Sequence, residues 1–128
     1  MEAEIKDRFM TKEDFLKLVV DPRLNRTKKL LLSKSKEYAP SDNVFHNFNK
    51  GATMDGISPE QCLWDYMRKH LVSIHDMIKY PQTMTREKMS EKIGDLMCYL
   101  LLLEGLFSEP LIEILNEIKN ETKHEQNS

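Results

Sequence analysis

The chain has 128 residues, a length that fits one domain with a single hydrophobic core. Its formal net charge is -2 with 31% charged residues, so it has neither the basic excess typical of proteins that bind DNA or RNA duplexes nor the acidic excess typical of disorder. Cys62 and Cys98 lie in apolar helical patterns, which favours buried reduced thiols. Because no apolar run is long enough to span a bilayer, we expect a cytoplasmic protein with no membrane partner.

The first part of the chain predicts two helices separated by a proline signal. Thr11 can cap a short helix that ends near Val20. Asp21 followed by Pro22 predicts a fresh start, with the aspartate as N-cap and the proline at the first helical position. This second helix is expected to end near Tyr38, before a further proline.

Two more helices are predicted in the middle of the chain. Ser41 can cap a piece that ends near Lys50, and segment 51–56 is expected to break it because it begins and ends with glycine. The residues S-P-E-Q from Ser58 onward form a capping box with proline at the first position, and the helix they open is expected to reach Lys79. Its predicted apolar stripe is Leu63, Met67, Leu71, Ile74 and Ile78.

The stretch 90–107 predicts the central buried helix of the fold. The helix is expected from about Arg86, and it is apolar nearly all round from Leu96. Ser108 and Pro110 predict the start of a last helix, followed by a polar tail at 120–128. No segment alternates with period two, so the sequence predicts a single all-α domain, 1–128 with its core at 22–119, built as a bundle of about five to six helices.

Polar residues on two neighbouring helices are expected to face each other across a helical hairpin. Glu91 and Asp95 lie four residues apart near the start of the central helix and share one face. The helix before it carries its own polar row, namely Lys69, His70, Ser73 and Asp76. Antiparallel packing of the two helices would bring the rows together; the simpler interpretation is that they are solvated surface residues beside a histidine at the edge of the core.

A third polar cluster precedes these rows. Glu37 lies near the C-terminal end of its predicted helix, where the helix dipole disfavours a carboxylate unless a cation or a metal is close. Asn47 and Lys50 follow in the next predicted helix. The cluster indicates a site, although an exposed Glu37 screened by water fits the pattern equally well.

The sequence E-K-I-G-D-L-M at residues 91–97, followed by an apolar run, resembles the E-E-L-G-D-L-L segment of the MazG-like all-α nucleotide pyrophosphohydrolases. The preceding K-H-L-V-S-I-H-D at 69–76 is laid out like their E-E-x-x-E-V-x-D segment. The resemblance covers residues 30–107, which are also similar to small, mostly uncharacterised phage and prophage proteins near that superfamily. It implies a bundle in which acidic side chains bind Mg²⁺, and the metal holds a nucleoside triphosphate for attack by water between its α- and β-phosphates.

Carried over residue by residue, the resemblance matches only part of that ligand set. Asp95 and Asp76 match expected acids, and Glu91 matches the acid ahead of the usual ligand pair. The other ligand positions fall on Lys69 or His70, Ser73 and Lys92, which are not ligands of Mg²⁺.

Two mechanisms follow from this exchange of acids for cations. In the first, a nucleotide pyrophosphohydrolase keeps Mg²⁺ on a different set of catalytic ligands, Glu37, Asp76, Glu91 and Asp95. In the second, lysines replace the charge of the metal, and a phage-type binder sequesters a nucleotide or another phosphorylated small molecule without cleaving it. The predicted substrate-binding residues are Lys69, His70, Ser73, Lys92, Asn47 and Lys50.

A third hypothesis is a helical protein that docks on a host protein, because eight methionines suit an adaptable apolar surface as well as a core. The resemblance implies a homodimer or homotetramer, and the breadth of apolar surface at 96–107 agrees with a partner chain that completes the core. A phage-encoded protein of this kind would act in the host cytoplasm.

Overall fold

The computed structural model describes residues 7–38 and 43–126, which contain helices and no strand. The predicted all-α bundle is confirmed. In chain order the elements are α1 (Lys12–Phe15), a π-helical turn (Leu16–Val20), α2 (Asp21–Tyr38), α3 (His46–Asp55), α4 (Pro59–Lys79), a 3-10 turn (Pro81–Thr83) and α5 (Arg86–Gln126).

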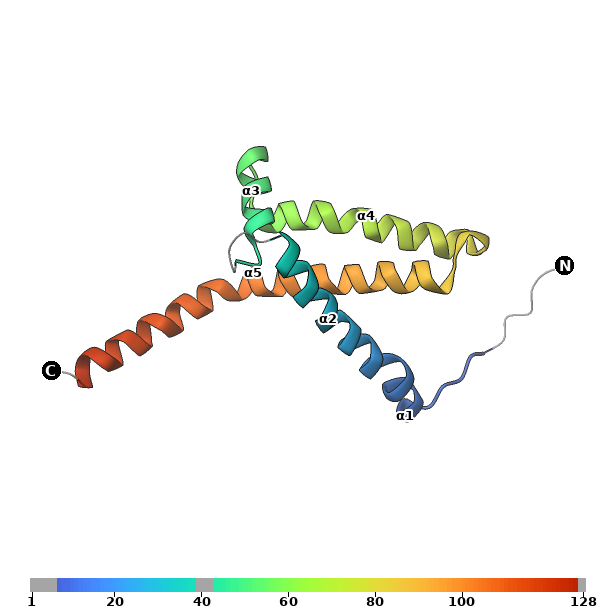
Figure 1. Ribbon diagram of the computed structural model, residues 1–128, viewed down its shortest axis with the longest axis horizontal. Helices are drawn as coiled ribbons and strands as arrows, with labels where there is room; N and C mark the ends of the chain where they lie inside the picture. The colour runs from blue at the N-terminus through green and yellow to red at the C-terminus, as the bar shows by residue number, and fades with distance from the viewer. Residues whose placement is uncertain (1–6, 39–42, 127–128) are drawn as a thin grey trace.

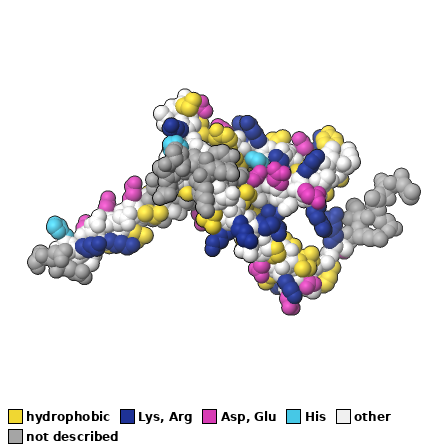
Figure 2. All heavy atoms as spheres, in the orientation of Figure 1, with side chains coloured by type: hydrophobic (Ala, Val, Ile, Leu, Met, Phe, Trp, Pro, Cys, Tyr) yellow, Lys and Arg dark blue, Asp and Glu magenta, His cyan; other side chains and the backbone are white. Residues whose placement is uncertain are grey.

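The body of the protein is an antiparallel hairpin of α4 and α5, joined by the 3-10 turn (Figure 1). α2 crosses α5 and packs on it, while α3 packs on α4 near the end of the hairpin that is far from the turn. The C-terminal half of α5 extends past this body. Figure 2 shows hydrophobic side chains at the surface over α1 and α3 and along this projecting part, with acidic and basic side chains interspersed.

No new helix begins at Asp21, because the helical residues run without a break from Lys12 to Tyr38. The prediction of two separate helices was therefore wrong. Thr11 caps α1 as expected, and its hydroxyl accepts from the Asp14 backbone N–H at 3.0 Å. Beyond α1, however, the Asp21 N–H donates to the Leu16 carbonyl in a π-helical turn, and the helix continues into α2. A π turn is wider than an α turn, so it accommodates the ring of Pro22, which lacks an N–H.

α3 begins later than the sequence predicts. Its first residue is His46, and the N–H of Phe45 just before it donates to the Asn43 side chain at 3.0 Å. This side-chain bond fixes the turn that leads into the helix. The predicted cap, Ser41, lies outside the described residues.

α3 also ends later than predicted, because the helix includes Gly51 and ends before Gly56. Gly56 has φ of 67°, a left-handed conformation that glycine adopts without strain. At Gly51, an added Cβ would lie 2.7 Å from the Cys62 Sγ on α4. Glycine therefore lets two helices approach closely here, whereas the sequence pattern indicated a break.

The predicted bounds of α4 are confirmed, since it begins after Ser58 and ends at Lys79. The Ser58 hydroxyl accepts from the Gln61 backbone N–H at 3.1 Å. The Gln61 side chain does not reach back; it donates to Asp65 at 2.9 Å, so half of the expected capping box forms.

The buried face of α4 differs in part from the predicted stripe. Leu63 and Met67 are buried as expected, but Leu71 and Ile78 are exposed, and Met77 is buried instead. Spacings of four and three residues keep positions 63, 67, 70, 74 and 77 on one side of an α-helix. Positions 71 and 78 lie about 100° further round.

α5 does not end at Ser108, so the predicted last helix is the continuation of α5 through Pro110. The Ser108 hydroxyl does not cap a new helix but donates to the Glu104 carbonyl at 2.8 Å. A proline inside a helix removes one backbone donor, and its ring crowds the carbonyl four residues earlier, yet α5 continues past Pro110. Residues 120–125 belong to the same helix and have exposed side chains.

The hydrophobic core lies where α3, α4 and α5 meet. Its buried members are Phe48, Ala52, Cys62, Leu63 and Leu106. The prediction that both thiols are buried is confirmed, because Cys62 and Cys98 are each 4% exposed. Across the described parts of the chain, no helix combines the length and the apolar character that a membrane span requires.

Replacing Gly51 with alanine should destabilise the protein by about 1–3 kcal/mol, because the methyl group overpacks the contact with Cys62. In most helices this change is stabilising, by up to about 1 kcal/mol. Urea unfolding followed by circular dichroism measures the difference. The matched control is the double variant Gly51→Ala, Cys62→Ala, which should lose less than the sum of the two single losses; additive losses would contradict the contact.

Candidate ligand-binding pocket

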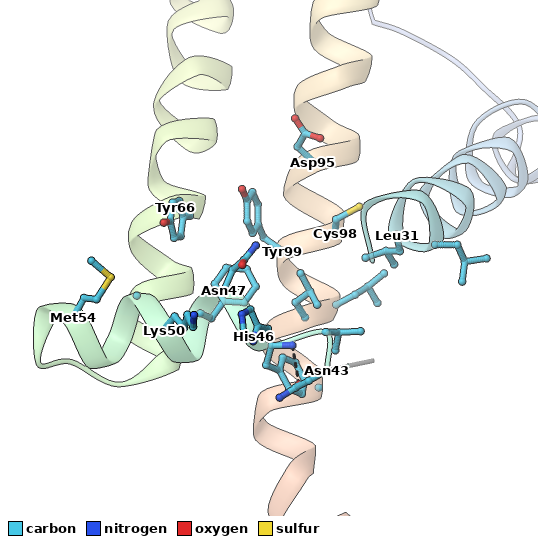
Figure 3. Close-up of a pocket in the computed structure, with 18 residues that line it drawn as sticks. Leu31, Asn43, His46, Asn47, Lys50, Met54, Tyr66, Asp95, Cys98 and Tyr99 are labelled. Atoms are coloured by element: carbon cyan, nitrogen blue, oxygen red, sulfur yellow. Dashed lines mark hydrogen bonds between the residues drawn. The ribbon is translucent and has the colours of Figure 1, made fainter. Parts of the chain in front are cut away.

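A cavity of about 770 Å³ lies between α2, α3, α4 and α5 (Figure 3). Leu31 and Leu32 of α2 form one side, and the start of α3 with the segment before it forms another. α4 contributes Tyr66, and α5 contributes a face that contains Cys98 and Gly105. The volume falls within the range of about 300–1,000 Å³ usual for small-molecule sites.

One wall of the pocket is aromatic. The Phe48 ring meets the Tyr66 ring edge to face, with centroids 6.0 Å apart and planes at 73°. It meets the Tyr99 ring in the same way at 6.4 Å. Because these rings come from α3, α4 and α5 and support one another, they form a fixed apolar surface against which a flat ligand can pack.

The rim of the pocket is polar and comes mainly from the start of α3. Asn43, His46, Asn47 and Lys50 line it, together with Asp95 from α5 (Figure 3). The asparagines can donate and accept hydrogen bonds, while Lys50 can only donate and ionised Asp95 can only accept. The pocket therefore joins an apolar wall to one cation and one carboxylate.

Asp95 lies between the pocket and a histidine of α4. The nearest carboxylate oxygen is 3.8 Å from His70 Nδ1, and the two side chains are only 14% and 19% exposed, respectively. The His70 ring in turn lies 5.2 Å from the Tyr99 ring. A protonated His70 would therefore attract the carboxylate across a poorly solvated contact between α4 and α5.

Two glycines of α5 let neighbouring segments approach the pocket. A Cβ at Gly94 would lie 2.9 Å from an Arg23 side-chain nitrogen of α2, and a Cβ at Gly105 would lie 3.0 Å from the Phe45 ring. An isolated glycine in an apolar helical pattern is the sequence signal for such a close approach. Gly94 precedes Asp95, so the G-D pair places a carboxylate beside the point where α2 crosses.

Arg23, which no sequence pattern predicted as a site residue, joins α2 to α5. Its guanidinium donates to the Ser90 hydroxyl at 2.8 Å, across 67 residues of sequence. Burial lowers the pKa of Arg23, and Arg26 lowers it further, while the opposing influence of Cys98 is smaller. No local pattern identifies this contact, because Arg23 reads as an ordinary solvated position in its own helix.

The structure brings together four of the predicted site residues. Asn47, Lys50 and Asp95 line the pocket. His70 of α4 does not line it but contacts Asp95. Tyr66 and Tyr99, which also line it, were not predicted. The available sequence signal for them was an aromatic residue among polar neighbours in α4 (Tyr66) and another within the apolar stretch of α5 (Tyr99).

The other predicted site residues lie elsewhere. Lys69 lines a second, smaller cavity of about 120 Å³ on α4, together with Asp55 and Asp65. Four predicted residues line neither of the two cavities described: Asp76 and Glu91 are exposed, and Ser73 and Lys92 are half-buried. The contact that the structure shows between the two polar rows is that of His70 with Asp95.

The predicted Mg²⁺ site involves Glu37, whose side chain is not among those the structure describes. Among the side chains that are described, no group of three or more His, Cys, Asp or Glu residues is arranged to hold a metal ion. The three other predicted ligands, Asp76, Glu91 and Asp95, therefore do not form such a group by themselves.

Comparisons with family models, with curated proteins and with solved structures gave no match. The resemblance to the MazG-like superfamily therefore stays a prediction.

In the native protein, N-ethylmaleimide should label Cys98 before Cys62. Cys98 lines the large cavity, whereas burial raises the pKa of the Cys62 thiol and the carboxylates of Asp55 and Asp65 raise it further. A raised pKa lowers the fraction of reactive thiolate. Peptide mass spectrometry after short labelling at pH 7.5 measures the order, and urea-unfolded protein, in which the two should react alike, is the control. Faster labelling of Cys62 would contradict the assignment.

Proposed function

We propose that the chain binds a nucleoside phosphate in this pocket, with the base against the aromatic wall and the phosphate toward Lys50. The observation that carries the proposal is the presence, in one cavity, of aromatic rings packed edge to face, a lysine and a poorly solvated carboxylate. Nucleotides combine a flat apolar ring system with hydrogen-bonding edges and negative charge, and such a pocket offers a partner for each.

The base that fits Asp95 best carries adjacent N–H donors. An ionised carboxylate accepts hydrogen bonds and can accept two in parallel. Guanine presents a ring N–H beside an exocyclic amino group, whereas the pairing edge of uracil or thymine offers a single ring N–H. We therefore expect a guanine-type base, held by Asp95 while its ring packs on the wall formed by Phe48, Tyr66 and Tyr99.

In this arrangement the phosphate contributes less to the binding free energy than the base does. Lys50 is exposed at the rim, so water screens its charge, and an exposed ion pair is worth at most about 1 kcal/mol. His46, Asn43 and Asn47 line the same rim and can add neutral hydrogen bonds. A monophosphate should therefore bind only a few times more tightly than the corresponding nucleoside.

Hydrolysis of a nucleoside triphosphate is the second candidate function, favoured by the position of Asp95 in the pocket. It demands more than binding does, because Mg²⁺ must be held by further oxygen ligands beside the phosphates. Release of pyrophosphate from a panel of nucleoside triphosphates, with and without Mg²⁺, separates the two functions. Magnesium-dependent release that Asp95→Asn abolishes would support the enzyme. Binding without release supports the proposal made here.

Asp95→Asn should weaken the binding of GMP by about tenfold or more, since hydrogen bonds to charged groups contribute about 1.5–3 kcal/mol. It should weaken binding of IMP less, because the base of IMP lacks the amino group. Isothermal titration calorimetry of both ligands measures the ratio. Equal losses for the two ligands, or no preference for GMP in the unmodified protein, would contradict base recognition by Asp95.

Lys50→Gln should weaken the binding of GMP by about fivefold, corresponding to about 1 kcal/mol, and should leave guanosine binding unchanged. The matched control is Lys69→Gln, which removes the same charge from the second, smaller cavity and should change neither affinity. The same calorimetric titration measures both. A larger effect of Lys69→Gln than of Lys50→Gln would place the phosphate at the other cavity.

A further inference from the structure

Part of the large cavity is lined by an aliphatic face that has no role in the nucleotide arrangement proposed above. That arrangement uses the aromatic wall, Asp95 and the polar rim near Lys50. The remaining lining includes hydrocarbon side chains from α2, from the segment before α3 and from α5. We call these side chains the aliphatic face: Leu31, Leu32, Val44, Leu101 and Leu102.

The aliphatic face and the aromatic wall lie on different sides of the cavity. Figure 3 shows Leu31 of α2 and Tyr66 of α4 on opposite sides of α5. On α5 itself, Leu101 is two positions beyond Tyr99, which places the two side chains about 160° apart around the helix axis. The side toward α4 therefore suits a flat ring, and the side toward α2 suits a hydrocarbon.

The aliphatic face is only partly covered by the rest of the chain. Leu32, Val44 and Leu101 are 58%, 49% and 44% exposed, although each lines the cavity. Their side chains have no hydrogen-bonding atoms, whereas an ordered water needs about two to four polar partners. Hydrocarbon in place of water is therefore favourable here, in proportion to the apolar area that it covers.

A hydrocarbon chain fits this face better than a peptide segment does. A peptide would bring backbone N–H and C=O groups next to leucine and valine side chains, which cannot form hydrogen bonds with them. A hydrocarbon chain has no such groups. Lys50 lies on the rim of the same cavity, so the chain can belong to a molecule whose phosphate lies near that lysine.

We propose that the aliphatic face holds a hydrocarbon chain of the ligand, so that the nucleoside phosphate is one that bears an alkyl or acyl group. For the head group this inference rests on the proposed function, because it keeps the base on the aromatic wall and the phosphate near Lys50. The chain is assigned from the aliphatic lining of the cavity.

The test is a titration of the isotopically labelled full chain with butyl phosphate and with hexyl phosphate, below their micelle-forming concentrations and followed by NMR. Hexyl phosphate should bind about tenfold more tightly, because each methylene group that becomes buried contributes a factor of about three to four. Leu101→Gln should reduce this ratio to about threefold or less, since it replaces part of the hydrocarbon wall with an amide.

The matched control is Leu100→Gln, which should leave the ratio of the two affinities unchanged. Leu100 is the neighbouring residue on α5 and is 49% exposed, but it does not line the cavity. The same spectra show whether each variant is folded. A ratio that both variants reduce equally, or that neither variant changes, would overturn the inference because the chain would then bind elsewhere on the protein.

A parallel titration with GMP separates this inference from the proposed function. Binding of GMP together with equal affinities for butyl and hexyl phosphate would overturn the inference, leave the aliphatic face to a protein partner and leave the proposed function standing. A dependence on chain length that Leu101→Gln removes, without binding of GMP, would support the aliphatic face and contradict the nucleotide.

Discussion

The close approach of two segments to one face of α5 is the constraint on which the pocket depends. Gly94 and Gly105 lie on this face, with Cys98 between them. At the first glycine α2 crosses, and at the second the Phe45 ring packs. A side chain at either glycine would push its neighbour outward, so the missing Cβ atoms determine how closely the walls approach. The part of α5 between these two contacts, which includes Cys98, lines the cavity.

The chemistry of the site follows from the same helix. Asp95 is one position beyond Gly94 and therefore lies about 100° round α5, between the pocket and α4. Packing in the hairpin then supplies His70 behind the carboxylate and Tyr66 beside the cavity. α3 adds the polar rim, because its first turns lie over the same face of α5. A carboxylate placed in this way lines the pocket and has a histidine on its other side.

Local signals predicted α4 and the start of α5 correctly because capping at Ser58 and the proline after it depend only on neighbouring residues. The same kind of signal was wrong at Pro22 and Pro110, because the helix continues past both prolines. A wider π-helical turn precedes Pro22, and α5 runs through Pro110 with one backbone hydrogen bond fewer. Of the site, Asn47, Lys50, His70 and Asp95 were predicted. The cavity itself, and the bond between Arg23 and Ser90, depend on contacts between distant segments that no periodicity encodes.

The two faces of the hairpin show why sequence alone misplaced the apolar stripe of α4. Helical periodicity identifies every apolar position, whether the residue packs within the chain or against another molecule. Positions 63, 67 and 77 pack inside, whereas 71 and 78 have the same apolar character but are exposed in the single chain. One chain supplies α2 and α3 to cover the pocket side and leaves the other side open.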